Sequence, residues 1–170
     1  STTIAEYMLP SLLGDFKTKY PDVNVHLKVS NSDGIVSMVE NNDIDLGVVE
    51  APVMNKNLVV EKCRNDRLVA IVPPQHELAG SKHVLLKQLL DHAYIAREEG
   101  SGTREVIQEY LVNAGLKPAD IHIAMELGSP EAIKGAVEAG MGVSIVSEVT
   151  IHKELQLGTL VALELDPPLE

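Results

Sequence analysis

The sequence predicts an α/β fold, because aliphatic strand patterns alternate with helical patterns along most of its 170 residues. Hydrophobic residues make up 45% of the chain, yet tryptophan is absent and Phe16 is the only phenylalanine. The core must therefore consist mainly of aliphatic side chains. Such a composition is typical of parallel sheets that are covered by helices.

The first part of the chain, residues 1–67, opens with a helical pattern that Pro10 should interrupt. Apolar residues recur at helical spacing from Ile4 to Phe16, and a proline inside a helix kinks or restarts it. A second helix should follow Asn31, because asparagine is a preferred N-cap residue. Apolar residues that alternate with polar ones or run together predict three strands, at residues 23–29, 44–50 and 58–62.

From residue 68 the alternation restarts. Pro130 suits the first turn of a helix, while Gly115 and Gly140 are typical of the residues that end one. The predicted helices cover residues 85–90, 103–114, 130–139 and 149–155. The predicted strands cover residues 68–72, 94–96, 121–127, 143–146 and 160–165.

Several predicted helix starts are rich in hydroxyl and amide side chains. Backbone N–H groups in the first helical turn lack partners, and the helix dipole favours negative charge there. Helix starts that follow parallel strands lie at one edge of the sheet, so two facing lobes would gather them around a small polar or anionic ligand. The alternative is that these residues are ordinary N-caps. The starts are Ser1-Thr2-Thr3, Asn31-Ser32, Ser101-Gly102-Thr103 and Gly128-Ser129.

The segment between Arg97 and Thr103 is the most informative of these, because a short strand, a glycine-rich turn and a helix start follow one another. Gly100 and Gly102 allow the backbone to approach a ligand closely, and Ser101 and Thr103 supply hydroxyl groups. An ordinary helix with Ser101 or Thr103 as its N-cap is the alternative interpretation.

Charge and cysteine content restrict the partners. A formal net charge of -11 argues against nucleic-acid binding through the bulk surface, which needs clustered Lys and Arg. Cys63 is the only cysteine, so an internal disulfide is excluded and a reducing, cytoplasmic location is expected. No apolar stretch approaches the roughly 20 residues that span a bilayer, so no membrane partner is expected.

Signals for catalysis are poor. The six histidines lack metal-ligand spacing, and the glycines around Ser101 are too close for a Gly-x-Ser-x-Gly nucleophile turn. We therefore expect no catalytic residue, no metal site, no cofactor and no enzymatic activity.

Four segments carry a family resemblance: TTIAEYMLP at residues 2–10, DIDLGVVE at 43–50, REEGSGTR at 97–104 and SPEAIKGAVEAGMGVS at 129–144. In this order and spacing they closely resemble the effector-binding domain of LysR-type transcriptional regulators. The segment 97–104 is similar to the subgroup that regulates sulfur assimilation and carbon fixation.

The resemblance implies two Rossmann-like lobes joined by crossover strands, as in type II periplasmic binding proteins. Residues 1–67 would form lobe I, 68–166 lobe II, and 167–170 the start of the return crossover. The first strand of lobe I and its C-terminal return strand are expected to be missing, and exposed sheet edges invite pairing with another chain.

The resemblance also implies partners. We expect a small polar or anionic effector between the lobes, and DNA contact only through an N-terminal helix-turn-helix domain that precedes this segment in the family. A homodimer is expected, with residues 10–29 packed antiparallel on residues 130–146 of the partner, and a tetramer is the alternative for the full-length protein.

Carried over by position, the effector contacts come from helix starts and strand ends in both lobes. Arg97 is a candidate charge partner for an anion, with pairing to Glu98 or Glu99 as the alternative. Ser129 is included because it precedes the last of the four helix starts. The contacts that the resemblance implies are Ser1, Thr3, Asn31, Ser32, Glu50, Ala51, Ser101, Gly102 and Thr103.

Two other functions stay open on the sequence alone. A solute-binding protein of a transporter would have a related two-lobed fold, but would carry a signal peptide upstream. A two-lobed metabolic enzyme would need a general acid or base in its cleft and would turn over a bound metabolite.

Overall fold

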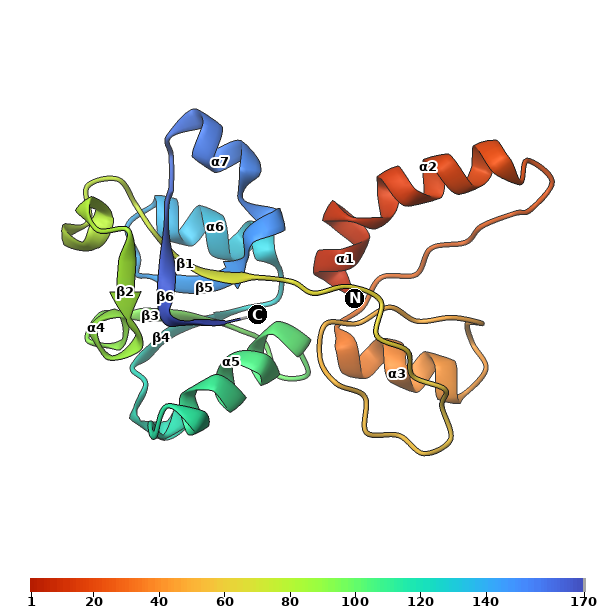
Figure 1. Cartoon of the computed structure of the whole chain (residues 1–170), viewed down its shortest axis with the longest axis horizontal. Coiled ribbons are helices and arrows are strands. Elements are labelled where there is room, and N and C mark those ends of the chain that lie inside the picture. The colour runs from red at the N-terminus through yellow and green to blue at the C-terminus, as the bar shows by residue number, and fades with distance from the viewer. Residues whose placement is uncertain (170) are drawn as a thin grey trace.

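The computed structural model describes residues 1–169 and has two lobes (Figure 1). The first lobe contains three helices and long connecting segments. The second contains both sheets and the remaining helices. The chain passes between them through the segment that leads into β1 (Leu68–Val72). Glu170, the last residue of the expected return crossover, lies outside the described residues.

The helices of the first lobe form as expected. The predicted break near Pro10 is confirmed, because α1 (Thr2–Tyr7) ends before Met8 and α2 (Leu9–Lys19) begins with Pro10 in its first turn. The predicted cap is confirmed as well. Asn31 precedes α3 (Ser32–Glu40), and its Oδ1 accepts a hydrogen bond of 3.0 Å from the Gly34 N–H.

The three strands predicted for the first lobe are wrong. Residues 23–29, 44–50 and 58–62 form no strand in the described part of the chain. A strand requires a neighbour that takes its N–H and C=O groups, and local alternation of side chains does not supply one. Val25 and Leu27 are 44% and 47% exposed, so this apolar stripe lies on the surface and not in the core.

The second lobe is built on a mixed four-stranded sheet. The strand order is β2 (His83–Leu85), β6 (Val161–Leu169), β1 and β5 (Ser144–Ser147). Strand β1 runs antiparallel to both β5 and β6, and only β2 and β6 pair in parallel. The expectation of purely parallel sheets is therefore wrong here, because the chain enters the lobe along β1 and returns along β6.

A second, parallel pair joins β3 (Tyr94–Arg97) to β4 (Ile123–Leu127). An isolated parallel bridge from Tyr94 to Val143 connects this pair to the chain just before β5. Strand β2 was not predicted, because three residues carry too little pattern. It precedes the predicted helix and overlaps it only at Leu85.

Helices cover this sheet system within a few residues of their predicted positions. Gly115 and Gly140 follow α5 (Gly102–Asn113) and α6 (Pro130–Glu138) with φ values of 77° and 74°, which confirms both expected stops. Residues 148–150 form a 3₁₀ turn, Glu148–Thr150, where the first turn of α7 (His152–Leu157) was expected. The helices are α4 (Leu86–Leu90), α5 (Gly102–Asn113), α6 (Pro130–Glu138) and α7 (His152–Leu157). Two further 3₁₀ turns cover Glu77–Gly80 and Pro118–Asp120.

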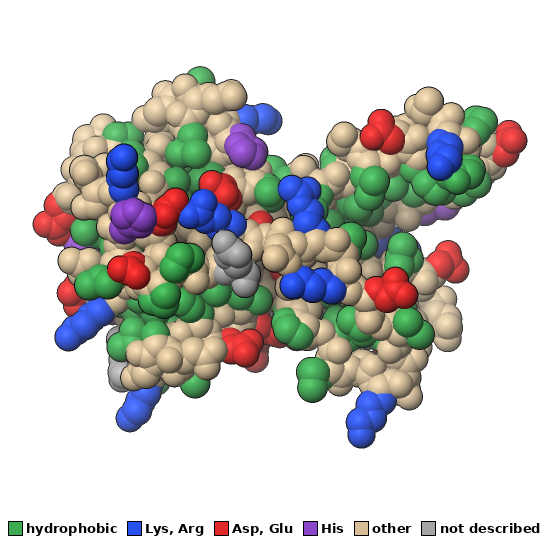
Figure 2. Space-filling model, viewed as in Figure 1, with side chains coloured by type: hydrophobic (Ala, Val, Ile, Leu, Met, Phe, Trp, Pro, Cys, Tyr) green, Lys and Arg blue, Asp and Glu red, His purple; other side chains and the backbone are tan. Residues whose placement is uncertain are grey.

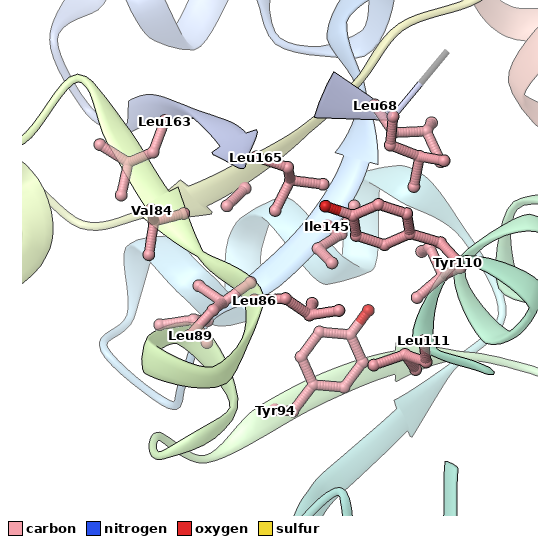
Figure 3. Packing of buried hydrophobic residues seen from close by; sticks show 14 of the residues in the cluster. Leu68, Val84, Leu86, Leu89, Tyr94, Tyr110, Leu111, Ile145, Leu163 and Leu165 are labelled. Atoms are coloured by element: carbon pink, nitrogen blue, oxygen red, sulfur yellow. The ribbon is translucent and has the colours of Figure 1, made fainter. Parts of the chain in front are cut away.

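The predicted aliphatic core is confirmed and lies in the second lobe, on both faces of the β1 sheet. Every residue of β1 is buried, and successive side chains point to opposite faces. Leu68, Ala70 and Val72 join the cluster that contains α4 and α5 residues (Figure 3). Val69 and Ile71 pack in the other cluster, with α6. The sheet of the second lobe is therefore packed on both faces.

Candidate ligand-binding site

Strand direction brings several helix starts to one edge of the second lobe. Because β3 and β4 are parallel, their carboxyl ends lie side by side, with Arg97 paired to Leu127. Helix α5 begins shortly after β3, and α6 begins shortly after β4. The bridge at Val143 gives the chain entering β5 the same direction. In open α/β sheets this edge is where ligands bind.

A narrow cavity, with a free volume of only about 10 Å³ in this arrangement of the lobes, lies at this edge. One wall is Thr3, from α1 of the first lobe, so the cavity lies between the lobes. The opposite walls come from the starts of α5 and α6, the end of β5 and the 3₁₀ turn behind it. The lining residues are Thr3, Arg97, Thr103, Pro130, Ile145, Val146, Ser147 and Thr150.

Four of the lining residues carry hydroxyl groups. Thr3 and Thr103 are 2% and 5% exposed. Ser147 Oγ donates to Asp66 Oδ1 at 2.9 Å, and Thr150 Oγ1 donates to the Ser147 carbonyl at 2.8 Å. Pairs of hydroxyls from two lobes can donate to or accept from a ligand while adding no net charge.

The buried cation of the cavity already has an anionic partner. Arg97 is 6% exposed, and its guanidinium donates to both carboxylate oxygens of Glu98, at 2.8 and 3.0 Å. The predicted alternative, pairing with Glu98, is therefore confirmed. The Arg97 carbonyl accepts a further hydrogen bond from Arg104 Nη1 at 2.8 Å. Arg97 faces the cavity as one member of a charge-balanced pair.

Three of the predicted contact residues are N-caps. Ser101 Oγ accepts from the Arg104 N–H at 3.5 Å, and Ser129 Oγ accepts from the Ala132 N–H at 3.2 Å. Together with Asn31, they confirm the N-cap interpretation for α3, α5 and α6. Thr103 is not a cap, because it lies one residue inside α5 and lines the cavity.

The starts of α3 and α5 meet beside the cavity, where the two lobes touch. A Cβ atom at Gly102 would lie 2.5 Å from Ser32 Oγ and 2.9 Å from the Ala51 backbone nitrogen. Ser32 Oγ also lies 3.4 Å from Glu50 Oε2, to which it donates. The lobes therefore pack directly against each other beside the cavity, through Gly102 of the second lobe and Ser32, Glu50 and Ala51 of the first.

Asn31 bridges the lobes directly. Its Nδ2 donates to the Glu99 carbonyl at 3.2 Å, and the Asp33 N–H donates to the Gly100 carbonyl at 3.3 Å. Gly100 has a φ of 79°, in the left-handed region that favours glycine. A side chain there would also meet Asn31 and Asp33 at 2.9 Å. Gly100 and Gly102 thus allow the backbones of the two lobes to approach each other closely.

The carboxyl group of Asp66 lies beside the cavity lining, where it accepts the hydrogen bond from Ser147. Burial raises the pKa of the Asp66 carboxyl above its ordinary value, and the Glu50 carboxylate raises it further. The hydrogen bonds from Ser147 and the Arg67 N–H act in the opposite direction and only partly offset this rise. An acidic group is thus hydrogen-bonded directly to Ser147 of the cavity lining.

Ser1 is 7% exposed, and its Oγ has no hydrogen-bond partner in the described part of the chain. Sequence reasoning missed five lining residues: Pro130, Ile145, Val146, Ser147 and Thr150. The predicted end of a strand at residue 146, on the same edge as Arg97, is the signal that could have located Val146.

No group of three or more His, Cys, Asp or Glu side chains within residues 1–169 is placed to hold a metal ion. Over the same residues, no helix is both long and apolar enough to cross a bilayer.

The fold defines a two-lobed α/β domain of the type II periplasmic-binding-protein kind, with a narrow cavity where its lobes meet. The family model of the LysR substrate binding domain matches residues 1–170, and the chain belongs to this family. The resemblance seen in the sequence is therefore confirmed.

Relatives support the same assignment. The chain is 34% identical over 160 residues to the RuBisCO operon transcriptional regulator of Allochromatium vinosum, covering 94% of this chain and 52% of that protein. It is 34% identical over 155 residues to the HTH-type transcriptional regulator CysL of Bacillus subtilis, covering 91% and 51%. The chain thus spans about half the length of these curated relatives. These two relatives bear out the predicted subgroup, and neither is named as an enzyme or a transport protein.

Among solved structures, the CcmR regulatory domain of Synechocystis PCC6803 in complex with 2-PG is similar, with a TM-score of 0.87 and 37% sequence identity. The alignment covers 99% of this chain and 79% of that one. The expected two-lobed fold is confirmed by this likeness.

Proposed function

We propose that the chain binds a small anionic or polar effector between its two lobes and passes this signal to a DNA-binding domain of the same regulator. Residues 1–67 form lobe I, residues 68–166 form lobe II, and residues 167–170 begin the return crossover. The observation that carries the proposal is the cavity in which Thr3 of one lobe faces Thr103 and Arg97 of the other.

The chemistry of the cavity suits an anion with hydroxyl or carboxyl oxygens. The start of α5 supplies backbone donors and a favourable dipole, and Thr3 and Thr103 supply hydroxyl donors. Some of the guanidinium N–H groups of Arg97 that now donate to Glu98 can donate to the ligand instead. Ser1, Asn31, Ser32, Glu50, Ala51, Ser101, Gly102 and Ser129 are proposed as nearby contacts that an opened cleft would expose.

Effector binding acts by shifting a population. A ligand that contacts both lobes stabilises one lobe arrangement over another by the difference in its affinity for the two. In a dimer, such a shift changes how paired subunits present their DNA-binding domains. A regulator of transcription works where the DNA is, so we also propose a cytoplasmic location.

A second copy of the chain is the proposed partner of the first lobe. Helix α2 has no buried residue, and Leu12 and Phe16 on it are 61% and 37% exposed. Hydrophobic side chains are visible on the arm that α2 forms (Figure 2). We propose that residues 10–29 pack antiparallel on residues 130–146 of the second copy, next to Met125, which is 37% exposed. The full-length protein forms this dimer or a tetramer built from it.

Calorimetric titration with 2-PG tests the ligand class, with inorganic phosphate as the matched smaller anion. Saturable binding of one 2-PG per chain, tighter than that of phosphate, is expected. Absence of binding by either anion up to about 1 mM, well above usual metabolite affinities, would reject an anionic effector of this kind.

A further inference from the structure

A second group of polar side chains lies beside α1, next to the ligand cavity, with which its groove shares Thr150. It borders a groove of about 840 Å³, much of it open to solvent, that is lined by Glu6, Tyr7, Glu131, Val149, Thr150, His152 and Lys153. The Tyr7 hydroxyl, from the first lobe, donates to Glu131 Oε1 at the start of α6 in the second lobe. This hydrogen bond joins the two lobes at a point distinct from the Asn31 contact.

Lys134 is the centre of this group. It is 3% exposed, and its Nζ lies 2.8 Å from each of three oxygens: Glu131 Oε1, Glu154 Oε1 and the Thr150 carbonyl. The ammonium also lies 5.2 Å from the centroid of the Tyr7 ring, on its face. An ammonium donates three hydrogen bonds, so Lys134 is fully satisfied and its position is fixed.

The protonation states keep this arrangement intact at neutral pH. Burial, together with the hydrogen bond to Glu131, raises the pKa of Tyr7 to about 12, so its hydroxyl keeps the proton that it donates. Burial disfavours the charged form of Lys134, but hydrogen bonds with Glu131 and Glu154 outweigh this effect and raise its pKa.

Three residues that line the ligand cavity lie next to the group around Lys134. Thr3 lies one helical turn before Tyr7 on α1, and residues four apart share a helix face. Pro130 immediately precedes Glu131, and Thr150 gives its carbonyl to Lys134. The Lys134 ammonium therefore contacts one residue that lines the cavity, Thr150, and is linked to Pro130 and Thr3 through Glu131 and Tyr7.

We propose that Tyr7, Glu131 and Lys134 are positioning residues that hold α1, and with it Thr3, against the second lobe. None of the three lines the ligand cavity, so they act on the effector through Thr3, Pro130 and Thr150. The inference rests on the proposed function for its consequence in binding, but the docking of α1 can be measured without any ligand.

The experiment compares the intact wild-type protein with Tyr7→Phe and Tyr110→Phe. Tyr110 is the matched control, because its hydroxyl also bonds across the fold, to the Pro167 carbonyl, but outside this group. Amide hydrogen exchange is followed in α1 and in α5 without ligand. Removing one hydrogen bond should accelerate exchange in α1 of Tyr7→Phe about three- to tenfold, and leave α5 unchanged. Tyr110→Phe should leave α1 unchanged.

Binding of 2-PG is then measured for the same proteins. The Kd of Tyr7→Phe should rise measurably above that of the wild type and of Tyr110→Phe, and at most by the factor seen in exchange, because only the fraction with α1 docked binds fully. Unchanged exchange in α1 of Tyr7→Phe, or equal acceleration in Tyr110→Phe, would overturn the proposal. Faster exchange with an unaltered Kd would overturn the positioning role. If the wild type binds no 2-PG, the ligand assignment fails while the exchange result still decides the docking of α1.

Discussion

Gly102 and Ser32 approach each other so closely that the lobes can meet only if residue 102 has no side chain. A Cβ atom there would lie 2.5 Å from Ser32 Oγ, which can turn away, and 2.9 Å from the Ala51 backbone nitrogen, which cannot. We expect Gly102→Ala to cost about 1 to 3 kcal/mol of stability, the usual range for overpacking, and to weaken 2-PG binding. Denaturant unfolding and calorimetry measure the two effects.

The matched control is Gly135→Ala on α6. No atom lies within 4 Å of a Cβ at Gly135, so the change should raise stability by about 0.4 to 1 kcal/mol and leave binding unaltered. Equal behaviour of the two alanine variants would show that the contact between lobes does not depend on Gly102.

Thr103 is expected to contact the effector with its hydroxyl. Thr103→Val keeps the shape of the side chain and should weaken 2-PG binding by about 0.5 to 1.5 kcal/mol, or up to about 3 kcal/mol if the oxygen it meets is charged. Ser101→Ala is the comparison for stability alone, because Ser101 is the N-cap of α5 and its loss should lower stability by about 1 kcal/mol. Loss of stability without loss of affinity in Thr103→Val would remove Thr103 from the site.

Leu12 should contribute to the dimer interface. It is 61% exposed on a helix that has no buried residue, so Leu12→Glu would place a charge in the proposed contact while leaving the fold of one chain intact. Sedimentation at tens of micromolar should show a dimer for the wild type and a larger monomer fraction for the variant. A wild type that sediments only as a monomer would contradict this prediction, as would a variant that dimerises equally well.

Glu131 should make stability depend on pH in the acid range. Burial tends to raise its pKa, but hydrogen bonds from Lys134 and Tyr7 outweigh burial and lower the pKa below 4.5. A carboxyl whose pKa is lower in the folded state stabilises the fold above about pH 4.5, and this contribution is lost as the pH falls through its folded value. Glu131→Gln should therefore be less stable at pH 7, by under about 1 kcal/mol because the side chain is largely exposed.

Below pH 4 the difference between wild type and Glu131→Gln should shrink. Urea unfolding at several pH values measures it. A stability difference that stays constant from pH 7 down to pH 3 would mean that the charge of Glu131 does not matter to the fold.

Local signals explain which parts of the fold could be predicted. Asn31 and Ser129 cap helices with their own side chains, and Pro130 prepares a helix start, so these boundaries are encoded within a few residues. No local signal predicts that β1 pairs antiparallel with β6. In this pairing Val69 lies opposite Glu164 and Val72 opposite Val161, about 90 residues later in the chain.

The candidate site divides in the same way. Thr3, Arg97 and Thr103 were found because each lies at or beside a helix start or a strand end that the sequence marks. Ser147 and Thr150 carry no such mark. Only the parallel bridge between Tyr94 and Val143, a contact between distant segments, brings the end of β5 to the cavity. The strands predicted for the first lobe were wrong for a related reason, since alternation cannot specify a pairing partner.

The hydrogen bonds from Asn31 to Glu99 and from Asp33 to Gly100 bear on how fast an effector can enter. The cavity beside this contact is too small to hold an effector, so an effector that binds there as proposed must wait until the lobes separate. Entry is then limited by the opening rate of the protein, and the observed rate of association should level off as the effector concentration rises. The tightness of the resting cleft would thus set how quickly the regulator responds, separately from how strongly it binds.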